Sequence, residues 1–372
     1  MAYNDSYYKE ITIENYRSIE KIEMKDLSNI NLLFGNNNCG KTSILEAIFA
    51  HACQFNVGYF FNIILPKRTQ GLFFGFYDLG ESIVNLFRKG SYTFENMKFS
   101  ITSKNKANEE TNTTYNFTPS NNLDEINPNT YEEFTIIKDT SYKHEATKNN
   151  QPEYLGELTI SNRKESKKFP IYQNLQFPRI QQSRNASYID ILEHRKPPSA
   201  ITIYSALKRT NTLQEFIQEM QKVFPEINDI ETIPFKNNAS NIYIDSKGEK
   251  IPFSIFGDGM RRWYYLIGNM VANKNSVQLI EEIDSTFHPE SIPMLSKTLV
   301  DYSVRYNNQI VMTSHNQEFL KIMLDTFKND EGILRDKIRV YTLKKIKNET
   351  KLLSLNGEEA RKNIEDYGLE LR

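Results

Sequence analysis

The chain is poor in cysteine and has no excess of charge of either sign, and both features exclude classes of protein. Its 372 residues contain only two cysteines, Cys39 and Cys53, so neither a disulfide framework nor a cysteine-based zinc cluster can form. Lys and Arg number 46 against 47 Asp and Glu, which gives a formal net charge of −1. Because dedicated nucleic-acid-binding proteins usually have a basic excess, any DNA or RNA contact must come from a local patch.

Long apolar runs are lacking as well. The stretch Tyr59 to Leu65 is among the longest, and it is far too short to cross a bilayer. Met1 to Glu10 is polar and has no apolar core of a signal peptide. No sustained heptad pattern and no repeat of about 20–50 residues occur, which argues against coiled-coil arms and solenoids. We therefore expect a protein of the reduced cytoplasm without a membrane segment.

The order of periodic segments predicts an α/β fold. Alternating residues predict strands at 9–15, 19–24 and 29–34, and a glycine-containing loop and a helix follow the third. Towards the other end, predicted strands at 277–281 and 309–313 alternate with helices. This alternation predicts a mixed, mainly parallel central sheet flanked by helices.

The composition and the periodicity of the sequence change between residues 91 and 185. Short alternating pieces at 92–101, 134–138, 158–161 and 169–172 are separated by loops rich in Asn, Thr and Lys. We expect an antiparallel β-rich insertion with disordered loops at 103–130 and 140–153, and a helical region that resumes around Ser187. The chain would then divide into segments 1–90, 91–185 and 186–372, with the two outer segments forming one domain.

The strongest motif runs from Gly35 to Thr42 and reads G-N-N-N-C-G-K-T. It matches G-x-x-x-x-G-K-[ST] and lies between a predicted strand and a predicted helix, the context that supports a P-loop. Its glycines let backbone N–H groups face phosphates, and the helix N-terminus adds its positive dipole end. We predict a P-loop that binds ATP and Mg²⁺, in which Lys41 reaches the β- and γ-phosphates and the Thr42 hydroxyl ligates the metal.

Two other predicted strands end in polar residues. Val277 to Ile280 is followed by Glu281 and Glu282; P-loop enzymes need one acid here for magnesium, and a second can orient and deprotonate the attacking water. We assign these roles to Glu281 and Glu282 respectively. The strand ending at Thr313 leads to His315, which we predict to sense the γ-phosphate. The alternatives are two solvated acids and an ordinary histidine.

A second possible anion-binding nest precedes a predicted helix. The segment Ser254 to Met260 contains Gly257, Asp258 and Gly259 where that helix begins. Small residues at a helix N-terminus can bind a phosphate. One chain does not need two nests for one nucleotide, but a dimer that presents this nest to its partner's ATP does. The alternative is an ordinary helix cap with a glycine turn.

In this order the four elements resemble the Walker A, signature, Walker B and switch histidine of ABC-type ATPases. Ile13 to Ile19 is similar to the N-terminal strand of the RecF, SMC and overcoming-lysogenization-defect (OLD) families. Phe256 to Arg262 resembles the signature of OLD-like ATPases more than the usual LSGGQ. Glu281 to Pro289 resembles the Walker B motif and D-loop of OLD-like ATPases. Tyr367 to Arg372 is similar to their C-terminal segment.

The resemblance implies that ATP binds between two protomers arranged head to tail, with the signature acting in trans. Glu282 would be the catalytic base and His315 the γ-phosphate switch, while Asp284 would face the partner from the D-loop. Arg17 would lie near the nucleotide, and Gln70 is a weak candidate for the metal-binding Q-loop. The implied P-loop contacts are Gly35, Asn36, Asn38, Cys39, Gly40, Lys41, Thr42 and Ser43; the implied trans contacts are Ser254, Gly257, Asp258 and Gly259.

Two departures from the family pattern bear on function. Glu281 stands where the Walker B aspartate is usual, which puts metal affinity or turnover in doubt. No Toprim acidic cluster follows His315, so the nuclease half of OLD proteins is not expected. OLD-like ATPases without Toprim resemble ATPase components of bacterial antiphage systems such as PARIS and Septu, in which the effector is a second protein. The resemblance thus implies an ATP-gated ATPase that holds or activates a separate effector.

Two other functions stay open at this stage. One is a RecF-like, ATP-gated DNA clamp for repair, favoured by Arg261 and Arg262 and by a basic region that could equally be a solvated face. The other is a nucleotide-binding module without turnover, which Glu281 allows. Aromatic residues of the insertion more readily form its own core than a base-stacking surface. The basic region comprises Arg335, Lys337, Arg339, Lys344, Lys345 and Lys347.

Overall fold

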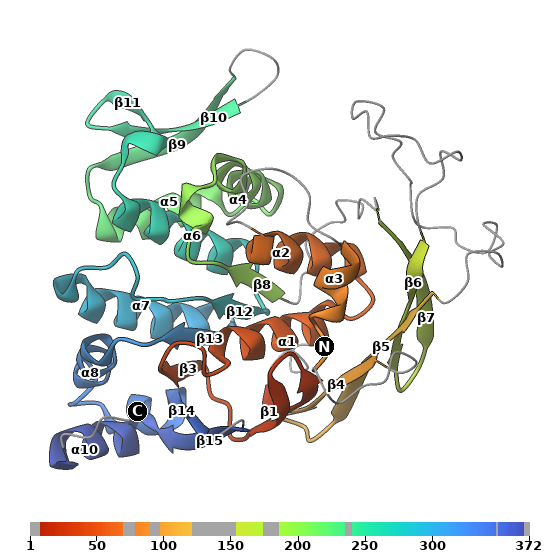
Figure 1. Ribbon diagram of the computed structural model, residues 1–372. Coiled ribbons are helices and arrows are strands. Elements are labelled where there is room, and N and C mark those ends of the chain that lie inside the picture. Colours follow the sequence, from red (N-terminus) through yellow and green to blue (C-terminus); the bar gives the residue numbers. More distant parts are fainter. Residues whose placement is uncertain are drawn as a thin grey trace.

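The computed structural model describes residues 8–69, 79–88, 97–120, 154–173, 186–234, 240–346 and 349–367. Within these residues the strands form three sheets. A mixed sheet runs through the middle of the molecule, an antiparallel sheet lies beside it, and a small sheet lies at one end (Figure 1).

The mixed sheet has six strands in the order β15-β14-β3-β13-β12-β8, and every neighbouring pair is parallel except β14 with β15. The strands β3, β12 and β13 are buried along their whole length, as expected for parallel strands covered on both faces. The bounds are β3 Ile30–Gly35, β8 Ala186–Ile189, β12 Val277–Ile280, β13 Gln309–Ser314, β14 Ile338–Ile346 and β15 Glu349–Asn356.

The antiparallel sheet joins the start of the chain to the predicted insertion. Its order is β2-β1-β4-β5-β6-β7, and Ile13 of β1 pairs with Ile101 of β4. Along β4, Met97, Phe99 and Ile101 point inward while the residues between them are more exposed, so one face of the sheet is apolar. The bounds are β1 Tyr8–Tyr16, β2 Ile19–Met24, β4 Met97–Asn105, β5 Glu110–Pro119, β6 Tyr154–Asn162 and β7 Ser166–Tyr172.

Helix α1 (Lys41–Cys53) packs between these two sheets and is buried on all sides. Its last turn is fixed by the antiparallel sheet: the His51 ring is hydrogen-bonded to Thr113 Oγ1 at 2.9 Å and to Ser103 Oγ at 2.8 Å. The Tyr115 hydroxyl donates to the Ala50 carbonyl at 2.8 Å. The antiparallel sheet therefore holds one end of the helix whose other end follows the predicted P-loop. Helices α2 (Val57–Thr69) and α3 (Leu79–Val84) belong to the same core.

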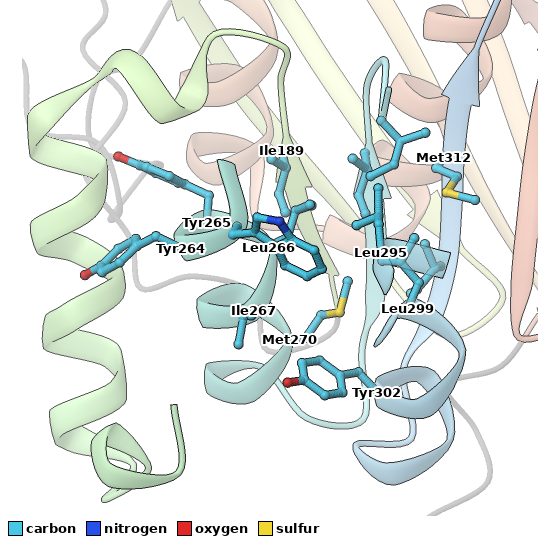
Figure 2. Packing of buried hydrophobic residues seen from close by; sticks show 14 of the residues in the cluster. Ile189, Tyr264, Tyr265, Leu266, Ile267, Met270, Leu295, Leu299, Tyr302 and Met312 are labelled. Carbon is cyan, nitrogen blue, oxygen red and sulfur yellow. The ribbon is translucent and has the colours of Figure 1, made fainter. Parts of the chain in front are cut away.

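The opposite face of the mixed sheet is covered by a second apolar core. Figure 2 shows Leu266 and Met270 of α6 together with Leu295 and Leu299 of α7 in this cluster, near Met312 of β13. All five side chains are at most 1% exposed. The helices on this side are α6 Asp258–Ala272, α7 Ile292–Arg305, α8 Gln317–Asp325, α9 Glu331–Lys337 and α10 Gly357–Tyr367.

The small sheet and two helices lie beyond α6. Strands β10 and β11 are joined by a two-residue hairpin loop, with Lys247 at φ 54° and Gly248 at φ 87°, the left-handed pair that such a loop requires. On α5, Leu213, Phe216 and Met220 are buried and form an apolar stripe at helical spacing. The bounds are α4 Pro197–Arg209, α5 Leu213–Val223, β9 Ile227–Pro234, β10 Ser240–Ser246 and β11 Glu249–Pro252.

Two predictions about secondary structure are wrong. The helical region expected to resume around Ser187 begins later, with α4 at Pro197, and Ser187 lies in the strand β8. The four residues of β8 are all buried beside β12, so this strand has no exposed face and no alternation to reveal it. The disordered loop expected at 103–130 contains β5, in which Tyr115 and Phe117 point into the core while Thr and Asn residues form the outer face. The predicted strand 134–138 and loop 140–153 lie outside the described residues.

The three-segment division at residues 90 and 185 stays a prediction. Strands from the first and second segments share one sheet, so the segments are continuous in hydrogen bonding. No helix in the described part of the chain is long and apolar enough to cross a membrane.

Candidate functional site

The parallel arrangement of the mixed sheet brings three of the predicted motifs to one edge. In the register of neighbouring strands, Phe34 pairs with Ser314, and Met312 pairs with Ile280. Because the strands run in the same direction, the residues that follow them emerge together: the loop after Gly35, the acids after Ile280 and the histidine after Ser314. Ligands of open α/β sheets bind outside the carboxyl ends of strands.

The glycine-containing loop has the backbone shape of a phosphate-binding loop. Gly35 has φ 149°, Asn38 φ 61° and Gly40 φ 99°, so the chain visits the left-handed half of conformational space three times in six residues. A Cβ atom on Gly35 would lie 2.5 Å from the Leu343 carbonyl oxygen of β14, which no side chain tolerates. The neighbouring strand therefore requires a glycine at the first position of the motif.

Lys41 is the first residue of α1, and its side chain folds back over the loop. Its Nζ donates to the carbonyl oxygens of Gly35 at 2.6 Å and Asn36 at 2.8 Å. Burial lowers the pKa of Lys41, and the nearby Cys39, Glu282 and Asp284 partly oppose this shift. The ammonium group is thus held at the mouth of the loop and within electrostatic reach of the acidic residues that follow β12.

These residues fit a nucleotide phosphate and a magnesium ion, which the fold family implies. Gly40 is the N-cap residue of α1 and provides no side-chain cap, so the N–H groups of the first helical turn are available to an anion. The Thr42 hydroxyl and the Glu281 carboxylate supply oxygen donors, the type that Mg²⁺ prefers. No cluster of three or more His, Cys, Asp or Glu residues that could hold a metal occurs among the described residues.

Glu281 is fixed through its backbone and its side chain. Its N–H donates to the Ile189 carbonyl at 2.9 Å, and its carbonyl accepts from Arg262 at 2.7 Å. The Tyr188 hydroxyl donates to Glu281 Oε1 at 2.6 Å. The carboxylate predicted to serve the metal is therefore held from the neighbouring strand β8.

Glu282 occupies a strained backbone position of the kind found at functional sites. Its φ is 40°, which is unusual for a residue with a side chain. Its N–H donates to Thr313 Oγ1 at 2.9 Å, and the following Ile283 N–H donates to the Thr313 carbonyl at 3.0 Å. One Glu282 carboxylate oxygen lies 3.8 Å from His315 Nδ1, so the structure brings the predicted base and the predicted switch together.

The predicted D-loop contains polar atoms without a partner. Asp284 Oδ1 and Thr286 Oγ1 are both buried and make no hydrogen bond within the described residues. The Thr286 carbonyl lies 3.4 Å from the position of a Cβ on Gly259. The D-loop of this chain therefore lies beside its own predicted signature.

The predicted signature forms the exposed start of α6. Ser254 and Gly257 are exposed, and no hydrogen bond or ion pair joins them to the P-loop within the described part of the chain. Asp258 accepts from Arg195 at 2.6 Å and pairs with Arg261; the Arg195 hydrogen bond, with support from Arg261, lowers the pKa of Asp258. Because two guanidinium groups flank this carboxylate, an approaching anion does not meet an uncompensated negative charge.

Arg262 is not a nucleic-acid contact, contrary to the hypothesis that grouped it with Arg261. Its side chain is fully buried and donates to the carbonyl oxygens of Asp190 at 2.5 Å and Glu281 at 2.7 Å. Burial lowers its pKa to about 10. Arg262 instead ties the signature helix to the ends of β8 and β12.

The other predicted site residues are less directly placed. Arg17 is committed to α1, because its Nε pairs with the buried Glu46 carboxylate at 2.6 Å. Glu46 lies on the helix that begins at Lys41, and the proximity of Arg17 to a nucleotide stays a prediction. Gln70 lies outside the described residues.

Sequence reasoning missed three residues that shape this site. Tyr188 holds Glu281, Thr313 holds the Glu282 backbone, and Arg262 holds the Glu281 carbonyl. Thr313 could have been recognised from the sequence, because a hydroxyl at the end of an apolar strand needs a hydrogen-bond partner. Tyr188 could not, because its strand was not recognised.

Comparisons with known proteins agree with this geometry. A family model described as "AAA domain, putative AbiEii toxin, Type IV TA system" matches residues 30–321. A Helicobacter pylori protein named ATP/GTP phosphatase is 22% identical over 338 residues, covering 84% of this chain and 86% of that protein. The solved SmcHead bound to the C-winged helix domain of ScpA has a TM-score of 0.56 at 11% identity, covering 96% of this chain and 99% of that one.

A second SMC head domain, from Thermotoga maritima, has a TM-score of 0.46 at 11% identity, covering 94% of this chain and 99% of that one. The first structural likeness confirms the predicted fold class, an α/β fold with mixed sheets and helices like that of SMC heads and ABC-like P-loop ATPases. At 11% identity, this likeness shows the fold and not the function.

Thr313→Val tests whether the Thr313 hydroxyl positions Glu282. The substitution keeps the volume but leaves the Glu282 N–H without its acceptor, which should lower the free energy of unfolding by about 1–3 kcal/mol. Because Glu282 would also shift, nucleotide turnover should fall at least roughly tenfold. Denaturant unfolding and a phosphate-release assay measure the two effects. Thr313→Ser, which keeps the hydroxyl, is the control, and wild-type turnover in Thr313→Val would contradict the role.

Proposed function

The chain belongs to the AAA-domain family whose model matches residues 30–321, and from this premise we propose that it is an ATPase that uses Mg²⁺ and closes as a head-to-tail dimer around ATP. The observation that carries the proposal is the convergence of Lys41, Glu281, Glu282 and His315 at one sheet edge, while Ser254 and Gly257 at the start of α6 are exposed. The relative's name, ATP/GTP phosphatase, supports nucleotide hydrolysis.

The residues of the loop and of the strand ends have complementary tasks in this proposal. The N–H groups at the start of α1 and the Lys41 ammonium bind the phosphates, and the Thr42 hydroxyl and Glu281 carboxylate would hold magnesium, which neutralises phosphate charge when bound. Glu282 accepts a proton from the attacking water. His315, 3.8 Å from the Glu282 carboxylate, contacts the γ-phosphate and registers its release.

The position of the predicted signature supports the proposed dimer. Ser254 and Gly257 are exposed, whereas the P-loop of the same chain makes no hydrogen bond with them within the described residues. Two copies arranged head to tail would place each start of α6 on the other's nucleotide, where its N–H groups and dipole favour an anion. Asp284, on the predicted D-loop, would face the same interface; among the described residues its Oδ1 has no hydrogen-bond partner.

We further propose that ATP-driven closure holds or activates a separate effector protein, as part of bacterial antiphage defence. Support comes from the resemblance of the segments 256–262 and 281–289 to OLD-like ATPases. The family description, which names a toxin of a type IV TA system, is in line with a protein that acts within a set of partners.

The RecF-like DNA clamp has lost part of its support. Of the two arginines that favoured it, Arg262 is fully buried and Arg261 pairs with Asp258. In the basic region, Arg335 pairs with Asp336 and the Arg339 guanidinium donates to the Asp26 carbonyl. We therefore keep the effector role as the proposed function.

Glu282→Gln is the sharpest test of the proposed base. Glutamine keeps the size of the side chain but cannot accept the proton, so steady-state ATP hydrolysis should fall about 10²–10⁴-fold while ATP binding persists. Glu290→Gln is the matched control, because Glu290 is 91% exposed and lies outside the site. Phosphate release is measured for both variants, and unchanged release in Glu282→Gln would refute the assignment. Lys41→Ala should lose ATP binding itself.

The effector role predicts a stable partner. Affinity purification of the chain, expressed with its neighbouring genes, should recover the product of one of those genes, and more of it with Glu282→Gln and ATP than with Lys41→Ala. Mass spectrometry identifies the recovered chains. Recovery of the ATPase alone under both conditions would argue against a separate effector while leaving the ATPase activity intact.

A further inference from the structure

Tyr188 has no role in the proposed function, although it lies at the site. Its hydroxyl donates to Glu281 Oε1 at 2.6 Å. We propose that Tyr188 is a positioning residue that orients the Glu281 carboxylate toward the metal. This inference rests on the proposed function, because that function assigns magnesium to Glu281.

The Tyr188 hydroxyl has little freedom to move. Tyr188 lies in β8, where it pairs in parallel register with Leu279 of β12, two residues before Glu281. Its side chain is 7% exposed, and its ring packs edge-on against Phe49 at a centroid distance of 5.4 Å. Phe49 belongs to α1, the helix that starts at the P-loop. The hydroxyl is therefore set in position by both the acid-bearing strand and the phosphate-binding helix.

A glutamate needs such support more than an aspartate does at this position. Glu281 has one more methylene group than the usual Walker B aspartate, and hence one more rotatable bond that must be fixed before the carboxylate can serve a metal. The backbone is already held, through the Ile189 carbonyl on one side and Arg262 on the other. The remaining freedom lies in the side chain, and that is what the Tyr188 hydroxyl restricts.

The length of this hydrogen bond suits the task. An O–H donor to an ionised carboxylate typically lies at about 2.5–2.7 Å and is stronger than a bond between neutral groups. Groups that hold a metal ligand from behind usually contribute about 10–100-fold to metal affinity. Removing the Tyr188 hydroxyl should therefore weaken magnesium binding without touching the phosphate contacts of Lys41.

The test follows nucleotide binding and does not depend on turnover. Binding of the fluorescent analogue mant-ATP is titrated with Mg²⁺ for the wild type, Tyr188→Phe and Tyr341→Phe. Tyr341 is the matched control, a buried tyrosine of the same sheet whose hydroxyl donates to the Lys25 carbonyl at 2.7 Å, away from the acids. We expect the half-saturating Mg²⁺ concentration to rise about 10–100-fold in Tyr188→Phe only, with unchanged mant-ATP affinity in EDTA.

A double-variant cycle separates positioning from loss of structure. In a Glu281→Gln background the carboxylate is gone, so Tyr188→Phe should cause no further change in the Mg²⁺ requirement. Melting temperatures of the two tyrosine variants show whether both fold. An equal Mg²⁺ response in wild type and Tyr188→Phe would overturn the inference alone. Wild-type mant-ATP binding that ignores Mg²⁺ would overturn the proposed metal role of Glu281 and the inference with it.

Discussion

A single buried cation ties together the parts of this protein on which the site depends. Arg262, fully buried in α6, donates to the carbonyl oxygens of Asp190 at the end of β8 and Glu281 at the end of β12. Burying a charged group without such partners costs free energy. Separating the helix from the two strand ends would therefore be unfavourable, because it would leave the guanidinium without its acceptors. The Arg262 hydrogen bonds therefore join α6 to the backbone at the acidic end of β12.

The Arg262 hydrogen bonds connect the two parts of the proposed dimeric site, the signature and the acid pair. The signature would sense the partner's nucleotide at the start of α6, and Arg262 lies about one turn further along the same helix, against the backbone that carries the acid pair. On the other side of the sheet, α1 is anchored by His51 and Tyr115 to the antiparallel sheet. Helix α1 and helix α6 thus belong to different apolar cores, which pack on opposite faces of the mixed sheet.

The sequence predicted best those parts of the site where the backbone conformation or the chemistry admits only one or a few residue types. The P-loop could be predicted because Gly35 and Gly40 need unusual backbone angles and Lys41 needs a fixed place after them. The convergence of Glu282 and His315 followed from parallel strands alone. Strand β8 could not be predicted, because four buried residues leave no periodic pattern, and with it Tyr188 was missed. Arg262 looked like a surface charge, since a sequence does not show which guanidinium is needed inside.

The most direct test asks whether one site is built from two chains. No atom of the described residues beyond its chain neighbours lies within 4 Å of the position of a Cβ on Gly257, so the Gly257→Glu variant should fold normally. Its new carboxylate would lie against the phosphates bound by the partner. We therefore expect Gly257→Glu to be inactive alone, and Lys41→Ala to be inactive alone as well. Co-expressed with different tags and purified through both, the two variants share one intact site, formed by the Gly257→Glu chain's P-loop and the Lys41→Ala chain's signature. The account predicts that ATP hydrolysis returns in this mixed complex. Failure to recover a complex, or a complex without hydrolysis, would contradict the shared site.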